Sequence, residues 1–201
     1  MSQNQQVSYQ IGNKLYLSIT DRCTLACRFC PKINGDNEVK GYDLSMNHRP
    51  EVDEIISAID DPSQYEQVVF CGYGEPTLRF KVLKQVAKWI KEHGGQVRVN
   101  TDGLGNLVNK RNILPEMQGI VDALSVSLNA HEKAIYDQHC DPALDASFES
   151  VKAFLKEAPQ YVPEVTATAI NGLEGVDIAA CKAIAEECGV GFRQRELDVV
   201  G

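Results

Sequence analysis

Short β-rich segments alternate with amphipathic helical patterns along almost the whole chain, and this alternation restricts the fold more than any other feature. The β-rich segments are residues 14–20, 67–71, 96–101, 123–129, 164–170 and 191–197. Strands that alternate with helices form parallel sheets joined by right-handed crossovers. We therefore expect an α/β fold with six parallel strands, either open or rolled into part of a barrel.

Apolar side chains spaced three and four residues apart mark the helices between these strands. Clear stripes occupy residues 52–59, 82–90, 148–155 and 178–188, and weaker helical patterns occupy 105–120 and 130–140. The sequence "HGG" ends the second stripe and Gly189 follows the last one, as expected at helix C-termini. The helices are thus predicted to cover the sheet with their apolar stripes.

Composition limits the size and the partners of the protein. The chain has 201 residues and 43% hydrophobic content, so we expect one domain spanning residues 1–201, with no separate C-terminal domain. Its 20 basic and 28 acidic residues give a formal net charge of -8, which disfavours nucleic acid as a partner. No signal peptide or long apolar run is visible, so we expect a cytoplasmic protein without a membrane partner.

Three of the seven cysteines lie close together, directly after the first expected strand. Cys23, Cys27 and Cys30 form a C-x3-C-x2-C pattern. In α/β folds the active site lies at the carboxyl ends of the strands. Three thiolates can hold a cubane iron–sulfur cluster and leave one iron without a protein ligand. The alternatives are chance clustering or a zinc site completed by a distant residue, although no second pair of ligands is visible.

The segment "CTLACRFC", with the aromatic Phe29 before its last cysteine, resembles the cluster loop of the radical SAM superfamily. The resemblance implies a (βα)6 partial TIM barrel that carries a [4Fe–4S] cluster on the three cysteines and binds S-adenosyl-L-methionine at the open iron. It further implies reductive cleavage of S-adenosylmethionine and abstraction of a hydrogen atom from a substrate by the 5′-deoxyadenosyl radical. An electron donor such as flavodoxin or ferredoxin would then be a partner.

Three further strand ends resemble motifs of the same superfamily. "CGYGEP" (71–76) is similar to the family's Gly-Gly-Glu-Pro with Tyr73 in place of the second glycine, "VNTDG" (99–103) to Asn-Thr-Asn-Gly, and "SVSLNA" (125–130) to an S-x-D strand. Each is also compatible with an ordinary turn or strand exit. The resemblance implies cofactor contacts from Phe29, Gly72, Tyr73, Gly74, Glu75, Asn100, Thr101, Asp102, Ser125, Ser127 and Asn129. Strand periodicity predicts that the last three share one face.

Two arginines and one long segment complete the candidate site. Arg193 and Arg195 share one side of the sixth strand. The resemblance implies that such residues, Arg193 above all, contact the cofactor carboxylate or an acidic substrate, while surface ion pairing is the alternative. Residues 31–49 show no periodicity, and we interpret them as an active-site loop rather than a surface excursion.

The remaining cysteines have weaker interpretations. Cys140 lies in a loop-like segment and is a catalytic candidate as a hydrogen-atom donor to a substrate radical. Cys71, Cys181 and Cys188 are expected in the core, so a single cluster is predicted.

Taken over nearly the whole chain, the sequence is most similar to small radical SAM proteins associated with TatD-type nucleases. A glycyl-radical activase and an enzyme acting on a deazapurine or modified nucleoside are alternatives, and a non-catalytic iron–sulfur or zinc-binding module is the alternative of another class.

Overall fold

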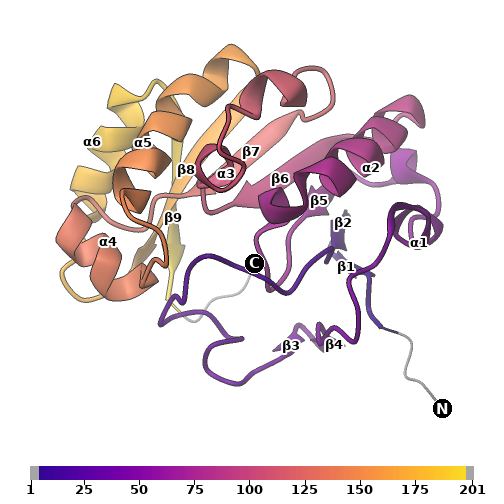
Figure 1. Ribbon diagram of the computed structural model, residues 1–201, viewed down its shortest axis with the longest axis horizontal. Coiled ribbons are helices and arrows are strands. Elements are labelled where there is room, and N and C mark those ends of the chain that lie inside the picture. Colours follow the sequence, from indigo (N-terminus) through magenta and orange to yellow (C-terminus); the bar gives the residue numbers. More distant parts are fainter. Residues whose placement is uncertain (1–4, 198–201) are drawn as a thin grey trace.

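The computed structural model describes residues 5–197, and a seven-stranded sheet organises them (Figure 1). The strand order is β1-β2-β5-β6-β7-β8-β9. The bounds are β1 (Ser8–Ile11), β2 (Lys14–Leu17), β5 (Gln67–Phe70), β6 (Val97–Thr101), β7 (Ala123–Ser127), β8 (Glu164–Asn171) and β9 (Gly191–Glu196). From β2 to β9 all neighbours pair in parallel, which confirms the predicted α/β fold. Each expected strand is present, several with shorter bounds.

Strand β1 is not among the six expected strands. It pairs antiparallel with β2 and forms one edge of the sheet. The connecting turn begins at Gly12, whose φ of +61° is a conformation that glycine adopts at little cost. The segment is only four residues long, and its pairing with β2 holds it in place, so its own sequence pattern was too short to predict it.

Helices follow the predicted apolar stripes. Their bounds are α1 (Val52–Ser57), α2 (Phe80–Glu92), α3 (Gly105–Val108), α4 (Lys133–Cys140), α5 (Ser147–Glu157) and α6 (Ile178–Glu187). The described residues also form short 3-10 helices, which are η1 (Pro62–Gln64), η2 (Pro76–Arg79), η3 (Leu114–Met117) and η4 (Ala158–Gln160). The weak pattern over 105–120 gives only α3 and η3, and Cys140 is the last residue of α4 rather than part of a loop.

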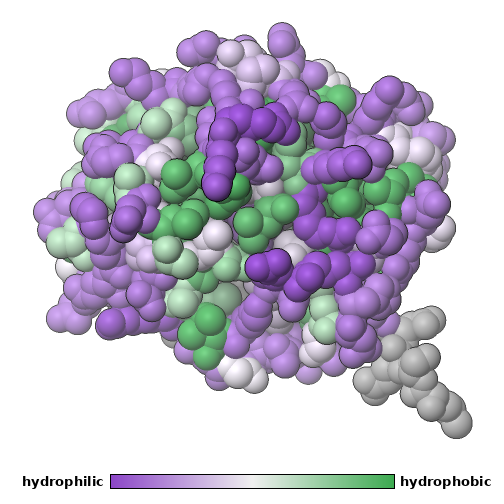
Figure 2. Space-filling model, in the orientation of Figure 1, coloured by the Kyte–Doolittle hydropathy of each residue, from purple (hydrophilic) through white to green (hydrophobic). Residues whose placement is uncertain are grey.

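The two faces of the sheet differ in what covers them. On the outer face, alternate strand residues such as Leu17, Phe70, Val99, Val126 and Ala167 join the helices in one hydrophobic cluster. The inner face carries the other set of strand residues, and no helix packs its apolar stripe there within the described chain. Figure 1 shows the helices on one side of the sheet and the N-terminal loops on the other. The space-filling view shows a mostly hydrophilic surface with hydrophobic side chains gathered near its middle (Figure 2).

Residues 31–49 contain a small hairpin rather than a structureless loop. Strands β3 (Glu38–Val39) and β4 (Tyr42–Asp43) pair antiparallel. Val39 and Leu44 are buried in a second hydrophobic cluster with Tyr9 and Tyr73. The hairpin is therefore packed against the inner face near the "CGYGEP" turn. None of the described helices is long and apolar enough to cross a membrane.

Candidate functional site

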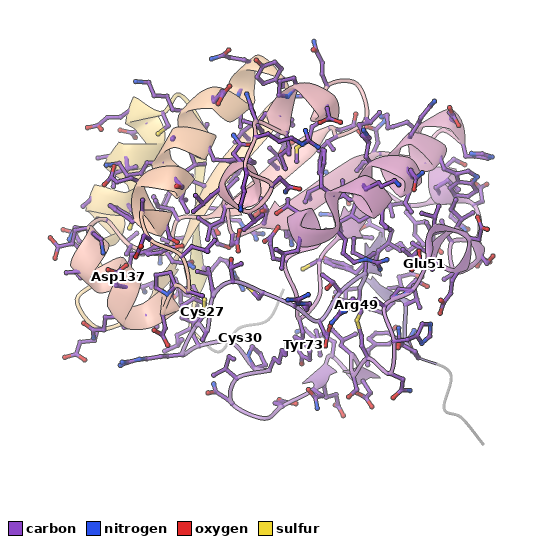
Figure 3. The ribbon with its side chains drawn as sticks, viewed as in Figure 1. Cys27, Cys30, Arg49, Glu51, Tyr73 and Asp137 are labelled. Carbon is purple, nitrogen blue, oxygen red and sulfur yellow. The ribbon has the colours of Figure 1, made fainter. Side chains whose placement is uncertain are left out.

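The cysteine loop, residues 23–30, follows β2 and lies against the C-terminal end of α4. The Ala26 amide donates to the Cys140 carbonyl at 3.0 Å, and the Arg28 amide donates to the His139 carbonyl at 2.9 Å. These backbone contacts fix the middle of the loop on an element more than a hundred residues away in sequence. The loop thus lies at the carboxyl edge of the parallel strands, and Figure 3 shows Cys27 beside α4 and Cys30 farther from that helix.

The three thiols of the cysteine loop have different neighbours. The Cys23 thiol donates to Asp102 Oδ2 at 4.0 Å, whereas the Cys27 thiol contacts Cys140. Burial, together with the Asp102 carboxylate, raises the pKa of Cys23 to about 12. Within residues 5–197 no three His, Cys, Asp or Glu side chains converge on a preformed metal site. Three thiols on one short loop are nonetheless a donor set that suits iron, which displaces thiol protons when it binds.

The "CGYGEP" turn packs directly against the start of the cysteine loop. A Cβ atom at Gly74 would lie 2.3 Å from the Thr20 carbonyl oxygen and 2.7 Å from that of Arg22. At Gly72, where φ is +134°, a Cβ atom would lie 2.5 Å from Ser18 Oγ. Only glycine fits these positions without moving the backbone. The glycines therefore allow the two loops at the ends of β2 and β5 to approach each other closely.

Glu75 connects the ends of β5 and β6 through a buried set of hydrogen bonds. Its Oε1 accepts from the amide and the hydroxyl of Thr77 at 2.9 and 2.6 Å, and from Thr101 Oγ1 at 2.8 Å. Its Oε2 accepts from the Asp102 amide at 2.7 Å. Both carboxylate oxygens of Glu75 thus accept hydrogen bonds from the protein. Glu75 and Thr101 therefore position the loops at the ends of β5 and β6. Burial, and then the charge of Glu75, raise the pKa of Asp102 well above its usual range.

The candidate polar residues of β6 and β7 divide into two groups. Asn100, Ser125 and Ser127 lie on the inner face of the sheet. Strand β7 ends at Ser127, and Asn129 follows with φ of +60°, so it does not continue the strand periodicity as predicted. Asn129 is buried and its amide donates to Cys140 Sγ at 3.7 Å.

Several buried polar atoms at this edge have no partner among the described residues. They are Ser18 Oγ, Tyr73 Oη, Asn100 Oδ1 and Asn129 Oδ1. Buried polar atoms are normally hydrogen-bonded, and exceptions need an explanation such as a ligand or water. Their grouping around the cysteine loop fits a polar cofactor at this place. Phe29, in contrast, packs against the main hydrophobic cluster, and Arg193 is exposed on β9.

Arg79 is a positioning residue that the sequence patterns did not reveal. Its Nη1 donates to the carbonyl of Ile19 at 2.8 Å and to that of Pro50 at 2.6 Å. These two carbonyls bracket the segment that contains both the cysteine loop and the β3–β4 hairpin. Arg79 therefore holds the two ends of this segment together. It follows the "CGYGEP" motif by three residues, but nothing in that spacing indicates its two carbonyl partners.

Known proteins share this fold. A structure of TYW1 with a lysine-pyruvate adduct bound has a TM-score of 0.65 at 15% sequence identity, covering 94% of this chain and 66% of that one. A structure of Streptococcus suis SuiB bound to precursor peptide SuiA also has a TM-score of 0.65, at 14% identity over 95% of this chain and 40% of the other. At such identities these likenesses show the fold alone.

The sequence comparisons are more specific. A tungsten-containing aldehyde ferredoxin oxidoreductase cofactor-modifying protein from Pyrococcus furiosus is 29% identical over 92 residues, which are 44% of this chain and 23% of that protein. The chain therefore spans about a quarter of the length of this relative. The family model of the Radical SAM superfamily matches residues 17–188, from the last residue of β2 to the residue that follows α6. The cysteine loop and the parallel partial barrel agree with this match. The chain therefore belongs to the radical SAM superfamily.

Proposed function

We propose that the protein holds a [4Fe–4S] cluster on Cys23, Cys27 and Cys30 and uses it to cleave S-adenosylmethionine reductively, so that a hydrogen atom is removed from a substrate still to be identified. The observation that carries the proposal is the position of the cysteine loop. It lies at the carboxyl edge of the parallel strands, against the glycine turn of β5 and beside a group of unpartnered buried polar atoms.

When bound, the cluster held by the three cysteines and S-adenosylmethionine would supply one-electron cleavage chemistry, with the electron coming from a flavodoxin or ferredoxin. The protein's own residues bind and orient. Gly72 and Gly74 let the β5 turn pack closely against the start of the cysteine loop, and the Glu75 hydrogen bonds keep that turn in register with the end of β6. Ser127 and Asn129 offer polar groups to the ribose or the amino-acid part, and Arg193 offers a cation to the cofactor carboxylate.

The test is the conversion of S-adenosylmethionine to 5′-deoxyadenosine and methionine by anaerobically reconstituted, reduced protein. The wild-type chain should hold about four irons, the content of one cubane cluster. Alanine at any one of Cys23, Cys27 or Cys30 should abolish the conversion and lower the iron content. Cys188→Ala is the matched control, because Cys188 is half-buried just after α6, packs against the main hydrophobic cluster and donates a hydrogen bond from its thiol to the Lys152 carbonyl at 3.9 Å.

The outcomes separate the enzyme from the alternatives. Retained cleavage in a variant that lacks one of the three loop cysteines would contradict the cluster assignment. Bound iron without any cleavage would favour a non-catalytic iron–sulfur module, and bound zinc after aerobic purification and dialysis, with no iron taken up on reconstitution, would favour a zinc-binding module. Transfer of a radical to a partner protein's backbone would identify a glycyl-radical activase.

A further inference from the structure

The cysteine loop runs antiparallel to the end of α4 and the residues that follow it. Three backbone hydrogen bonds and one bridge share a single register, and they are the Ala143 amide to the Thr24 carbonyl at 2.9 Å, the Ala26 amide to the Asp141 carbonyl at 3.3 Å, the Arg28 amide to the His139 carbonyl at 2.9 Å, and the bridge of Leu25 with Pro142. In this register Cys27 lies directly opposite Cys140. The two cysteines thus occupy a non-hydrogen-bonded position of an antiparallel pairing, where facing side chains are closest.

The end of α4 sets this register. The helix ends at Cys140, and Asp141 follows with a left-handed φ of +42°, a conformation that aspartate adopts more readily than most residues. The Asp141 amide donates to the Asp137 carbonyl at 3.1 Å and so closes the last turn of the helix. The chain then leaves the helix and runs beside the cysteine loop. The place of Cys140 opposite Cys27 therefore follows from the backbone of α4 and its cap.

The side chains of Cys27 and Cys140 also share their surroundings. Cys140 is fully buried in the main hydrophobic cluster, and Cys27 packs against that cluster. The two thiols are hydrogen-bonded to each other. Cys23 and Cys30 are outside this cluster among the described residues. Cys27 is thus the cysteine of the loop that lies between the other two and α4.

Asn129 orients the thiol of Cys140. Asn129 Nδ2 donates to Cys140 Sγ at 3.7 Å, and the Asn129 backbone amide donates to the Thr168 carbonyl at 3.1 Å, which ties this residue to β8. Cys140 therefore accepts a hydrogen bond from one side, and its own S–H group is available to donate on the other. A cysteine that binds iron has lost its proton, so Cys27 in that state can only accept. The hydrogen bonds then run from Asn129 to Cys140 and from Cys140 to Cys27.

We propose that Cys140 donates a hydrogen bond from its thiol to the sulfur of Cys27 when Cys27 binds the cluster, and that this bond makes the cluster easier to reduce. The inference rests on the proposed function, since it requires a cluster on the cysteine loop. Hydrogen bonds to the sulfur atoms are among the factors that set the reduction potential of an iron–sulfur cluster. Reduction adds a negative charge, so a donor beside a ligand sulfur stabilises the reduced form more than the oxidised form. Cys140 is then a positioning residue and needs no contact with a substrate.

The midpoint potential of the cluster in the reconstituted full chain tests the proposal. It is measured without S-adenosylmethionine, by a reductive titration that is followed by electron paramagnetic resonance. Cys140→Ala removes the donor and should lower the equilibrium constant of one-electron reduction about three- to ten-fold, which is at most about 59 mV. Cys140→Ser keeps a donor and should lie between the wild type and the Ala variant. Cys140→Val fills the space without a donor, and it replaces the Ala variant if that variant fails to fold.

Cys181→Ala is the matched control for the loss of a buried thiol. Cys181 is also fully buried in the main hydrophobic cluster, but it belongs to α6, which packs against β8 and β9. Its removal leaves a similar cavity, so the potential should stay at the wild-type value. The proposal is overturned if Cys140→Ala has the wild-type potential, if Cys140→Ser lowers the potential as far as Cys140→Ala does, or if Cys181→Ala lowers it equally.

Oxidation of the cluster-free chain tests the pair of cysteines without the cluster. The chain carries Cys23→Ser and Cys30→Ser and is treated with diamide, a diazene that takes up one hydrogen from each thiol while the two sulfur atoms join. Facing Cα atoms at a non-hydrogen-bonded position are about 4.5 Å apart, which is within the range of a disulfide. We expect mass spectrometry of proteolytic peptides to show a disulfide between Cys27 and Cys140. Its absence would overturn the contact and with it the proposal.

Iron content and cleavage of S-adenosylmethionine, measured in the same preparations, separate this inference from the proposed function. A wild type that holds about four irons and cleaves S-adenosylmethionine, with an unchanged potential in Cys140→Ala, would overturn the inference and leave the proposed function intact. A potential that depends on Cys140 in a protein without cleavage activity would do the reverse. A wild type that takes up no iron would overturn both. Cys140→Ala should retain the wild-type iron content, since Cys140 is not one of the three ligands.

Discussion

The outer and inner faces of the sheet are made from alternate residues of the same strands, yet they have opposite chemical character. On the outer face Val97 and Val99 of β6 are fully buried under the helices. On the inner face the intervening Arg98 and the following Asn100 each keep a buried polar atom that has no partner among residues 5–197. Burial of apolar area stabilises the outer face, while the inner face leaves hydrogen-bonding capacity unused.

This difference indicates that the outer face stabilises the fold and that the inner face serves binding. Helix packing on the outer face supplies stability, and among the candidate site residues it involves Cys27, Phe29 and Cys140, which belong to the main cluster or pack against it. The loops at the carboxyl ends of β2, β5 and β6 join each other on the other side, through Gly74, Glu75 and Arg79. A change on the outer face should therefore act mainly on stability, and a change on the inner face mainly on binding. Neighbouring residues of one strand allow this to be tested directly.

The largest expected effect comes from a matched pair on β7. Leu124 is 1% exposed on the outer face, and Leu124→Ala should lower the free energy of unfolding by about 2–5 kcal/mol through lost burial and a residual cavity. Ser125 faces inward, so Ser125→Ala should change it by less than about 0.5 kcal/mol and instead weaken S-adenosylmethionine binding. Urea denaturation and calorimetric titration of both variants measure the two quantities. Equal losses of stability would show that the faces are not energetically distinct.

The sequence predicted the outer face better than the inner one. The stripe of Leu83, Val86 and Ile90 in α2 is a local pattern with a helical period, and all three residues are buried in the structure. Strands β1 and β3–β4 were missed because they are two to four residues long and depend on partners for their stability. A period cannot be recognised in so few residues.

For the candidate site, the sequence predicted which segments meet but not how they are joined. Strand order alone brings the ends of β2, β5 and β6 to one edge, so motifs after these strands were expected to lie together. The contacts of Glu75 with Thr101, and of Arg79 with Pro50, join residues 26 and 29 positions apart. Such contacts follow from the packing of loops and have no periodic trace in the sequence. Asn129 was misplaced for the same reason, since its positive φ ends the strand pattern.

A smaller effect is expected where the loops at the carboxyl edge are joined. In Glu75→Gln an amide group replaces one acceptor oxygen, so at least one of the donors from Thr77, Thr101 or Asp102 loses its acceptor in a buried place. The free energy of unfolding should fall by about 1–3 kcal/mol, the cost of a buried unsatisfied polar group. Glu66→Gln is the control, because Glu66 is half-exposed and its pair with Lys14 should contribute at most about 1 kcal/mol. A Glu75 variant as stable as the Glu66 variant would show that the hydrogen-bond set does not hold the loops.

The smallest expected effect concerns Tyr73, whose ring packs with Tyr9, Val39 and Leu44 while its buried hydroxyl has no partner among the described residues. Tyr73→Phe keeps the ring and removes a polar atom that gains nothing from burial, so stability at neutral pH should stay within about 0.5 kcal/mol of wild type or rise. Burial first, and the charge of Asp36 next, raise the pKa of Tyr73 to about 12. An unfolded tyrosine ionises near pH 10, so wild type should lose stability relative to the Phe variant as pH rises from about 10 to 12. Denaturation of both proteins at pH 8 and at pH 11 measures this. A clear loss of stability in Tyr73→Phe at pH 8 would mean that the hydroxyl has a partner, and that the inner face is better satisfied near the β5 turn than its contacts indicate.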